Sequence, residues 1–174
     1  MCHCSLHYSN LKILSLAKNE YHGGSLRTIV SKKNSSLKEF KIDKFVNYEN
    51  KKNIYKSIFY KKMMKKINLK KKILLTKLNN LSAKGYTVSG IGAGAKSNTF
   101  LTFYGLDNKI IKFLTDSSKF KKNKYTPISR IIIKDDKELI NYKKIACIIL
   151  SWNISSLIID KIKKLNKKIK IIYT

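Results

Sequence analysis

The chain has 174 residues, of which 43% are hydrophobic, so it is large enough for one ordinary domain with an appendage and is not disordered by composition. The longest apolar run, Ile145–Leu150, is far shorter than a membrane span and no secretory leader is visible, so we expect a soluble, cytoplasmic protein with no membrane partner. The net charge of +28 comes from lysines spread along the whole chain, with Arg27 and Arg130 as the two arginines, so it does not single out nucleic acid as the partner.

The N-terminal residues contain a group that looks metal-like in composition. Cys2, His3, Cys4 and His7 stand close together, but C-x-C is not the C-x2-C spacing that holds zinc, and no second pair follows. We therefore expect no bound metal. Cys147 lies inside an apolar run and is expected to be a small core residue.

Two short strands come first in the chain. Residues 11–16 and 25–31 carry the apolar and β-branched residues of strands, and a loop that contains His22, Gly23 and Gly24 joins them. The polar stretch that follows is predicted to be a loop.

A long helix is predicted next, from Asp43 as the N-cap to Lys84, with Gly85 in the position just past the helix end. One face of this helix has apolar residues at helical spacing, which predicts that it packs on a core. The residues of this stripe are Met63, Ile67, Leu74, Leu78 and Leu81.

After Gly85, short β-rich runs alternate with helical segments. This alternation favours an α/β fold: a Rossmann-like open parallel sheet of about five strands flanked by helices, preceded by a short β-hairpin and the long helix. We expect three segments: an N-terminal strand pair over residues 1–42, a helical connector over 43–84 and the Rossmann-like domain over 85–174. The expected strands are 86–92, 109–116, 130–134, 145–152 and 168–173, with helices at 97–104, 135–142 and 154–165.

A glycine-rich loop follows the first strand of this domain. Gly90, Gly92 and Ala95 satisfy G-x-G-x-x-A between a strand and a helix, where backbone amides can approach a phosphate. Asp116 ends the next strand, where an acid that binds ribose would stand. The glycine pattern of this loop fits a dinucleotide site, an S-adenosylmethionine site or a tight structural turn.

Two features argue against S-adenosylmethionine at this loop. Val88 and Ser89 stand before Gly90, where such sites usually carry an acid, and the region after Gly85 is short for a complete methyltransferase domain. Lys96 lies at the edge of the loop and is followed by Asn98 and Thr99. A cation with polar neighbours favours a phosphorylated ligand.

Five motifs occur in an order typical of one family. They are "HGGSLR" at 22–27, "GIGAGAKSNT" at 90–99, "TD" at 115–116, "KYTPIS" at 124–129 and "SWN" at 151–153. With them the chain resembles, from about Leu11 to Tyr173, the C-terminal domain of the S-adenosylmethionine-dependent sugar C-methyltransferases. It departs from that family at four positions. Proline, serine or alanine is usual where Gly94 stands, and glycine where Ser97 stands. Glycine is usual where Ile128 stands, and proline where Ile132 stands.

The resemblance implies a domain that helps to hold a nucleotide-linked deoxysugar. In the full-length family, S-adenosylmethionine and zinc are bound by preceding domains. We expect no room for these domains before Leu11, and therefore no cofactor on this chain and no assignable catalytic residue. The chain would then be a fragment, or a subunit that works with a separate S-adenosylmethionine-binding domain. The expected substrate-binding residues are His22, Gly23, Gly24, Arg27, Gly90, Gly92, Ala93, Lys96, Asn98, Thr99, Asp116, Trp152 and Asn153.

Some alternatives to this interpretation stay open. His22 fits a capped Gly-Gly turn as well as a binding loop, and Trp152 fits packing at the sheet edge as well as stacking on a ligand ring. The whole chain could instead be a stand-alone nucleotide- or dinucleotide-binding module, or a lysine-rich nucleic-acid-binding protein.

Overall fold

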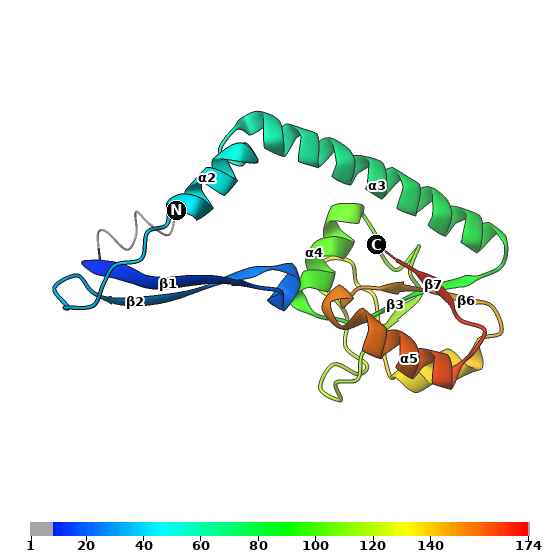
Figure 1. The fold of residues 1–174 in the computed structure, drawn as a ribbon. Helices are drawn as coiled ribbons and strands as arrows, with labels where there is room; N and C mark the ends of the chain where they lie inside the picture. The colour runs from blue at the N-terminus through cyan, green and yellow to red at the C-terminus, as the bar shows by residue number, and fades with distance from the viewer. Residues whose placement is uncertain (1–8, 174) are drawn as a thin grey trace. The chain divides into compact units, whose positions relative to one another are not determined.

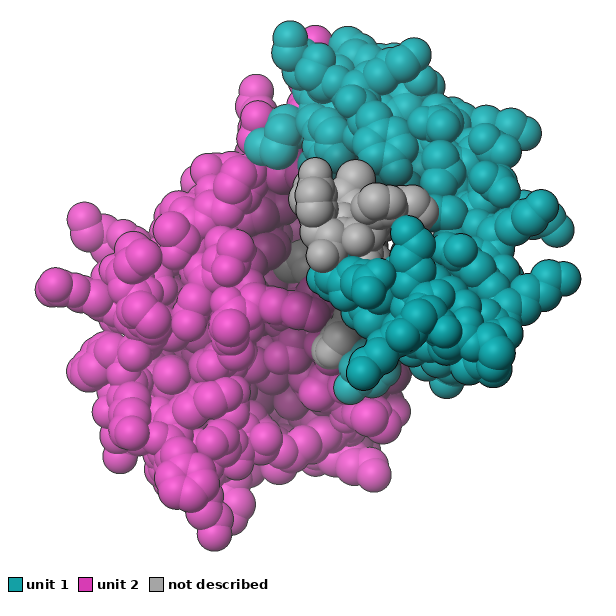
Figure 2. Space-filling model, turned by 90° about the vertical axis from the view of Figure 1, so that its left-hand side faces the viewer, with its two compact units in different colours: residues 1–64 teal, residues 65–174 magenta. Residues whose placement is uncertain are grey.

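The computed structural model describes residues 9–173, so Cys2, His3, Cys4 and His7 lie outside the described residues. The chain divides into two compact units, residues 1–64 and residues 65–174, shown in teal and magenta in Figure 2. Within the described part, no helix has both the length and the apolar character that a membrane crossing requires.

The first unit contains the expected hairpin. Strand β1 (Leu11–Asn19) pairs antiparallel with β2 (Ser25–Lys32), and a 3₁₀ turn, η1 (Tyr21–Gly23), joins them. Gly23 and Gly24 have φ angles of 84° and 121°, which glycine adopts without strain. Among the described residues of this unit, Ile13 is the one buried apolar side chain.

The predicted long helix is two helices, α2 (Asp43–Lys51) and α3 (Ser57–Ala83). The helical backbone is interrupted at Asn53, which has a left-handed φ of 55°. The expected N-cap was wrong, because Ile42 holds that position and Asp43 is the first helical residue. At the other end, Gly85 has a φ of 75° and the Tyr86 N–H donates to the Leu81 carbonyl, as expected for a glycine-terminated helix.

The predicted apolar stripe is correct for only part of α3. Leu74, Leu78 and Leu81 are buried in a core cluster of the second unit. Ile67 is half-buried and Met63 is 40% exposed, so the expectation was wrong for Met63. The boundary between the two units falls just after Met64, and the buried positions lie beyond it.

The second unit is built on a five-stranded parallel sheet (Figure 1). Its spatial order is β5-β4-β3-β6-β7, and every strand pair in it is parallel, so the predicted Rossmann-like architecture is confirmed. Two elements differ from the expectation. The strand before Asp116 is shorter and has three residues, and the segment after Asp135 is a 3₁₀ helix. The elements are β3 (Thr87–Ile91), α4 (Ala95–Tyr104), β4 (Phe113–Thr115), β5 (Ile133–Lys134), η2 (Asp136–Asn141), β6 (Ile145–Ile149), η3 (Trp152–Ile154), α5 (Ser155–Leu165) and β7 (Lys170–Ile172).

Each face of this sheet has its own apolar core. Side chains alternate between the faces of a strand, so Leu114 and Ile148 pack with leucines of α3 and α4, while Phe113 and Ile149 pack with residues of η2 and α5. Cys147 is fully buried on the second face, which confirms it as a core residue. Burial raises the pKa of its thiol to about 12, so the thiol stays protonated and unreactive at neutral pH.

The chain order of the strands defines where a ligand is expected. β3 is the first strand of the sheet in sequence but lies at its centre, with β4 on one side and β6 on the other. After β3 the chain adds β4 and β5 on one side of it, and then returns to add β6 and β7 on the other side. The order of strand addition therefore reverses between β3 and β6. In open parallel sheets, ligands bind in the crevice outside the carboxyl ends of the strands at such a point.

Candidate ligand site at the carboxyl edge of the sheet

The loop after β3 contains one glycine that cannot be replaced without strain. Gly92 has a φ of 95°, and a Cβ placed there would stand 2.0 Å from the Oγ of Ser151, at the end of β6. A Cβ on Gly90 would meet the side chains of Leu114 and Leu150 in the core, whereas one on Gly94 would come no closer than 4.0 Å to Ser97. Gly92 thus brings the loops after β3 and β6 into close contact.

The backbone amides of this loop are bonded within the chain. The Gly92 N–H donates to the Thr115 carbonyl at 2.8 Å, and the Ala93 N–H donates to Asp116 Oδ2, also at 2.8 Å. The Gly94 N–H donates to Ser97 Oγ at 3.3 Å. These bonds hold the loop in shape, and a phosphate would have to displace them to use the same three amides.

Asp116 joins this loop to the loop after β4. Its Oδ1 accepts from the Ser118 N–H at 2.9 Å, and its Oδ2 accepts from Ala93 and from the Lys121 ammonium at 3.0 Å. Partial burial acts to raise the pKa of Asp116, but the N–H groups of Ala93 and Ser118 and the Lys121 ammonium outweigh it and hold the pKa below its ordinary value. The carboxylate therefore stays charged and already has three donors.

Two predicted residues from separate loops meet at this edge. Lys96 is exposed in the first turn of α4, and its Nζ lies 5.0 Å from the ring centroid of Trp152 in η3. This is cation–π geometry. Trp152 remains 46% exposed, so both the lysine and part of the indole ring reach solvent, at the point where the strand order reverses.

The other predicted residues of this unit lie close by in sequence and differ in role. Thr99 donates to the Ala95 carbonyl inside α4 at 3.4 Å, and Asn153 is exposed in η3. Asn98 is half-buried, and its Oδ1 is one of the buried side-chain oxygens that have no hydrogen-bond partner among the described residues.

Four predicted residues belong to the other unit. His22, Gly23 and Gly24 form the turn between β1 and β2, and Arg27 is an exposed residue of β2 that pairs with Ala17. Among the predicted residues, the structure thus joins Ala93 to Asp116 and Lys96 to Trp152, and it places four others in the first unit.

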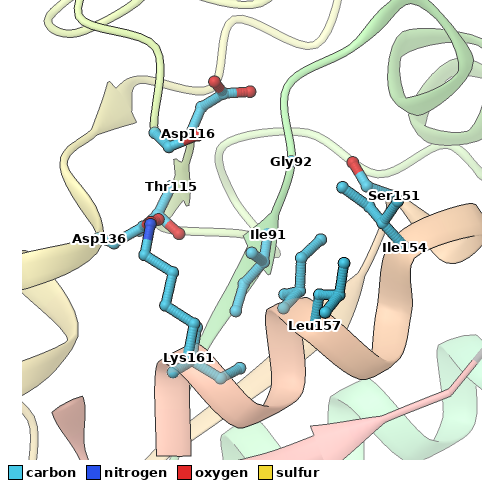
Figure 3. Close-up of a pocket in the computed structure, with 12 residues that line it drawn as sticks. Ile91, Gly92, Thr115, Asp116, Asp136, Ser151, Ile154, Leu157 and Lys161 are labelled. Carbon is cyan, nitrogen blue, oxygen red and sulfur yellow. The ribbon is translucent and has the colours of Figure 1, made fainter. Parts of the chain in front are cut away.

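A pocket of about 400 Å³ opens beside Gly92 on the face of the sheet that carries α5 (Figure 3). Asp136 and Lys161 face each other on one side of it, 2.5 Å apart, and Ser151 lies on the other side. Of its lining, Gly92 and Asp116 were predicted as site residues, and Thr115 and Ser151 stand in two of the five motifs without having been predicted as site residues. Sequence reasoning missed Asp136 and Lys161, because no spacing in the sequence joins them to the motifs. The residues that line it are Ile91, Gly92, Thr115, Asp116, Ser117, Asp136, Ser151, Ile154, Leu157, Ile158, Lys161 and Ile162.

Over the described residues, no group of three or more histidine, cysteine or acidic side chains is arranged to hold a metal ion. The carboxyl edge presents a lysine over an indole ring, a tightly bonded glycine loop, and a pocket with a carboxylate and hydroxyl groups.

These features define a Rossmann-like domain with a candidate ligand site at the centre of its sheet. The family model of the C-methyltransferase C-terminal domain matches residues 20–173. The chain belongs to this family, as the five ordered motifs indicate.

A characterised relative is similar over part of its length. C-methyltransferase NovU of Streptomyces niveus is 34% identical to this chain over 82 residues, which is 47% of this chain and 20% of NovU. The match thus spans about a fifth of the length of that relative.

Proposed function

We propose that this chain is the substrate-binding domain of an S-adenosylmethionine-dependent C-methyltransferase that acts on a nucleotide-linked deoxysugar. Membership of the C-methyltransferase C-terminal domain family supports the general class. The observation that carries the finer proposal is the pairing of Lys96 with Trp152 beside the glycine loop. An ammonium group suits a phosphate, and a partly exposed indole ring suits contact with the ring of a sugar or a base.

The residues of the glycine loop do not fit S-adenosylmethionine. Val88 and Ser89 precede Gly90 where an acid would be needed, and the carboxylate of Asp116 is held by the Ala93 and Ser118 amides and by Lys121. In this proposal the methyl donor is bound by another domain, and no step of methyl transfer is assigned to this chain.

The first unit suits a role at a domain interface. Its hairpin and helices expose many large apolar side chains, including Leu26 and Ile29 on β2 and Tyr55 and Ile58 near the start of α3. Exposed apolar surface of this kind marks interaction sites. In the proposal this surface packs against the domain that binds S-adenosylmethionine.

The proposal is tested by titrating a thymidine-diphosphate deoxysugar into the full chain by calorimetry. Lys96→Ala should weaken binding by about 1.5–3 kcal/mol, because it removes a charge-assisted hydrogen bond to phosphate. Lys163→Ala is the matched control, since Lys163 is exposed on α5 outside the site, and it should bind as the wild type does.

Two results would contradict the proposal. If the wild type and Lys96→Ala bind the nucleotide sugar with equal affinity, the glycine loop is a structural turn and not part of a binding site. Micromolar binding of S-adenosylmethionine in a parallel titration would place the methyl donor on this chain.

A further inference from the structure

A second concave surface lies on the second unit, formed by the last turns of α3 and the first residue of β7. It is a groove of about 300 Å³, and it shares no residue with the pocket beside Gly92. Two aliphatic residues and three lysines supply most of its surface, and we call it the lysine groove. The aliphatic residues are Ile73 and Leu81, and the lysines are Lys77, Lys84 and Lys170.

The positive charge of the lysine groove is not neutralised within the fold. Residues 65–84 contain seven lysines and no acidic residue. Over residues 9–173, every ion pair uses other lysines, so Lys77, Lys84 and Lys170 have no carboxylate partner. Lys170 Nζ lies 5.6 Å from the ring centroid of Tyr86, a cation–π contact that leaves its charge in place. The groove therefore attracts negative charge.

The apolar part of the groove is open to solvent at one residue. Ile73 is 59% exposed, whereas Leu81 is 4% exposed and belongs to the core cluster under α3. A single exposed aliphatic side chain is ordinary on a protein surface. Here, however, it lines a hollow that also carries uncompensated ammonium groups. A side chain that enters the hollow contacts aliphatic carbon while its neighbours reach the lysines.

We propose that the lysine groove binds an acidic segment of a partner protein. In this complex an aliphatic side chain of the segment packs on Ile73 and Leu81, and the carboxylates on either side of it face the three lysines. The apolar anchor supplies binding energy at the centre of the contact, and the complementary charges select the partner.

A nucleic acid uses only part of this surface. Its phosphates suit lysines, but it has no aliphatic side chain to cover Ile73. None of the described residues that line the groove is aromatic, so a base has no ring on which to stack. The apolar surface of the groove therefore favours a protein segment.

A second copy of this chain does not supply the acidic segment. The net charge of +28 opposes association of two copies. The densest acidic run of the chain is residues 135–138, and Asp135, Asp136 and Glu138 are each already paired with a lysine of the same chain. The partner is therefore a different protein with an acidic segment.

The test uses a fluorescein-labelled peptide in which glutamates flank a pair of leucines. The full chain is titrated into it at physiological salt, and binding is followed by fluorescence anisotropy. The dissociation constant should be on the order of 10–100 µM. A peptide with serines in place of the leucines carries the same charge and should bind at least about tenfold more weakly, because the apolar contact is lost.

One pair of variants tests the apolar part of the groove. Ile73→Ser leaves the charge unchanged and should weaken binding of the leucine peptide about fivefold. Ile140→Ser is the matched control, since Ile140 is 55% exposed in η2 and does not line the groove, and it should bind as the wild type does. Both side chains are exposed, so the melting temperatures should stay close to that of the wild type.

A second pair of variants tests the charge. Replacement of Lys77 and Lys84 together by glutamine should weaken binding about fivefold. Replacement of Lys65 and Lys72 together by glutamine removes the same charge from exposed positions outside the groove, and should change binding by less than about twofold.

The outcomes separate this proposal from its competitors and from the proposed function. Equal binding of the leucine and serine peptides, equal effects of the two lysine pairs, or no binding at millimolar concentration would overturn it. So would a parallel titration of oligothymidylate in which Ile73→Ser weakens binding of the oligonucleotide and not of the peptide. The inference goes beyond the proposed function, because the groove lies outside the candidate ligand site and the titration of a nucleotide sugar does not depend on it.

Discussion

Ile128 is a residue in a backbone conformation that does not suit it. It is 80% exposed and has a φ of 64°, in the left-handed region that β-branched side chains avoid. Such a conformation costs about 1–2 kcal/mol for a residue with a Cβ. The structure therefore explains why glycine is usual here in the family that the chain resembles.

Replacing this residue should stabilise the protein. Ile128→Gly removes the strain and exposes no core, although glycine is more flexible in the unfolded chain, so we expect a net gain of about 1 kcal/mol in the free energy of unfolding. Urea unfolding would measure it. Ile154→Gly, at a φ of −128°, is the control and should lose stability. A loss in Ile128→Gly as well would show that the left-handed turn is unstrained.

The carboxylate of Asp116 should make the stability depend on acid pH. Its pKa is lowered in the folded state, so its contribution is complete above the unfolded pKa of about 3.9 and is lost as the pH falls through the folded pKa. The difference in stability between the wild type and Asp116→Asn should therefore shrink when urea midpoints are measured from pH 6 down to pH 3. A difference that does not change with pH would contradict this assignment.

At the scale of elements, α3 shows what periodicity can and cannot predict. The apolar spacing correctly indicated a helix with a core-facing stripe, because Leu74, Leu78 and Leu81 recur at helical intervals. Periodicity could not show where the core beside the helix ends, and it extended the stripe to the exposed Met63. It also missed the interruption at Asn53, since asparagine is common in this chain and a left-handed residue has no periodic signature.

Truncation along this stripe should separate its buried and exposed parts. Leu78→Ala removes a fully buried side chain and should cost about 2–5 kcal/mol, whereas Met63→Ala should cost less than about 1 kcal/mol. Chemical denaturation followed by circular dichroism would compare them. Equal losses would mean that the first half of α3 packs as tightly as the second.

At the scale of the whole molecule, the parallel sheet was predictable and the pocket was not. Alternating strands and helices leave few topologies for a short chain, so the fold class follows from the pattern. Lys96 and Trp152 were each predicted, but their contact depends on how two loops meet. Thr115, Asp136 and Lys161 become neighbours only through the three-dimensional arrangement of β4, η2 and α5.

The two units should differ in local stability. The sheet of the second unit has two buried cores, whereas Ile13 is the one buried apolar side chain among the described residues of the first. Hydrogen exchange of the full chain should show amides of β3 and β6 exchanging at least about 1,000-fold more slowly than those of β1 and β2. Equal protection of the hairpin and the sheet would indicate that the two units unfold together as one cooperative unit.

The central position of β3 has a consequence for how the protein is made. On the ribosome, β3 can pair with β4 once Thr115 has left the exit tunnel, but its other edge waits until β6 has also emerged. At about 5–20 residues per second, the stretch from Asp116 to Ile149 takes on the order of a few seconds. During that interval the nascent chain carries an open, apolar strand edge, which is the feature that chaperones recognise and that aggregation exploits.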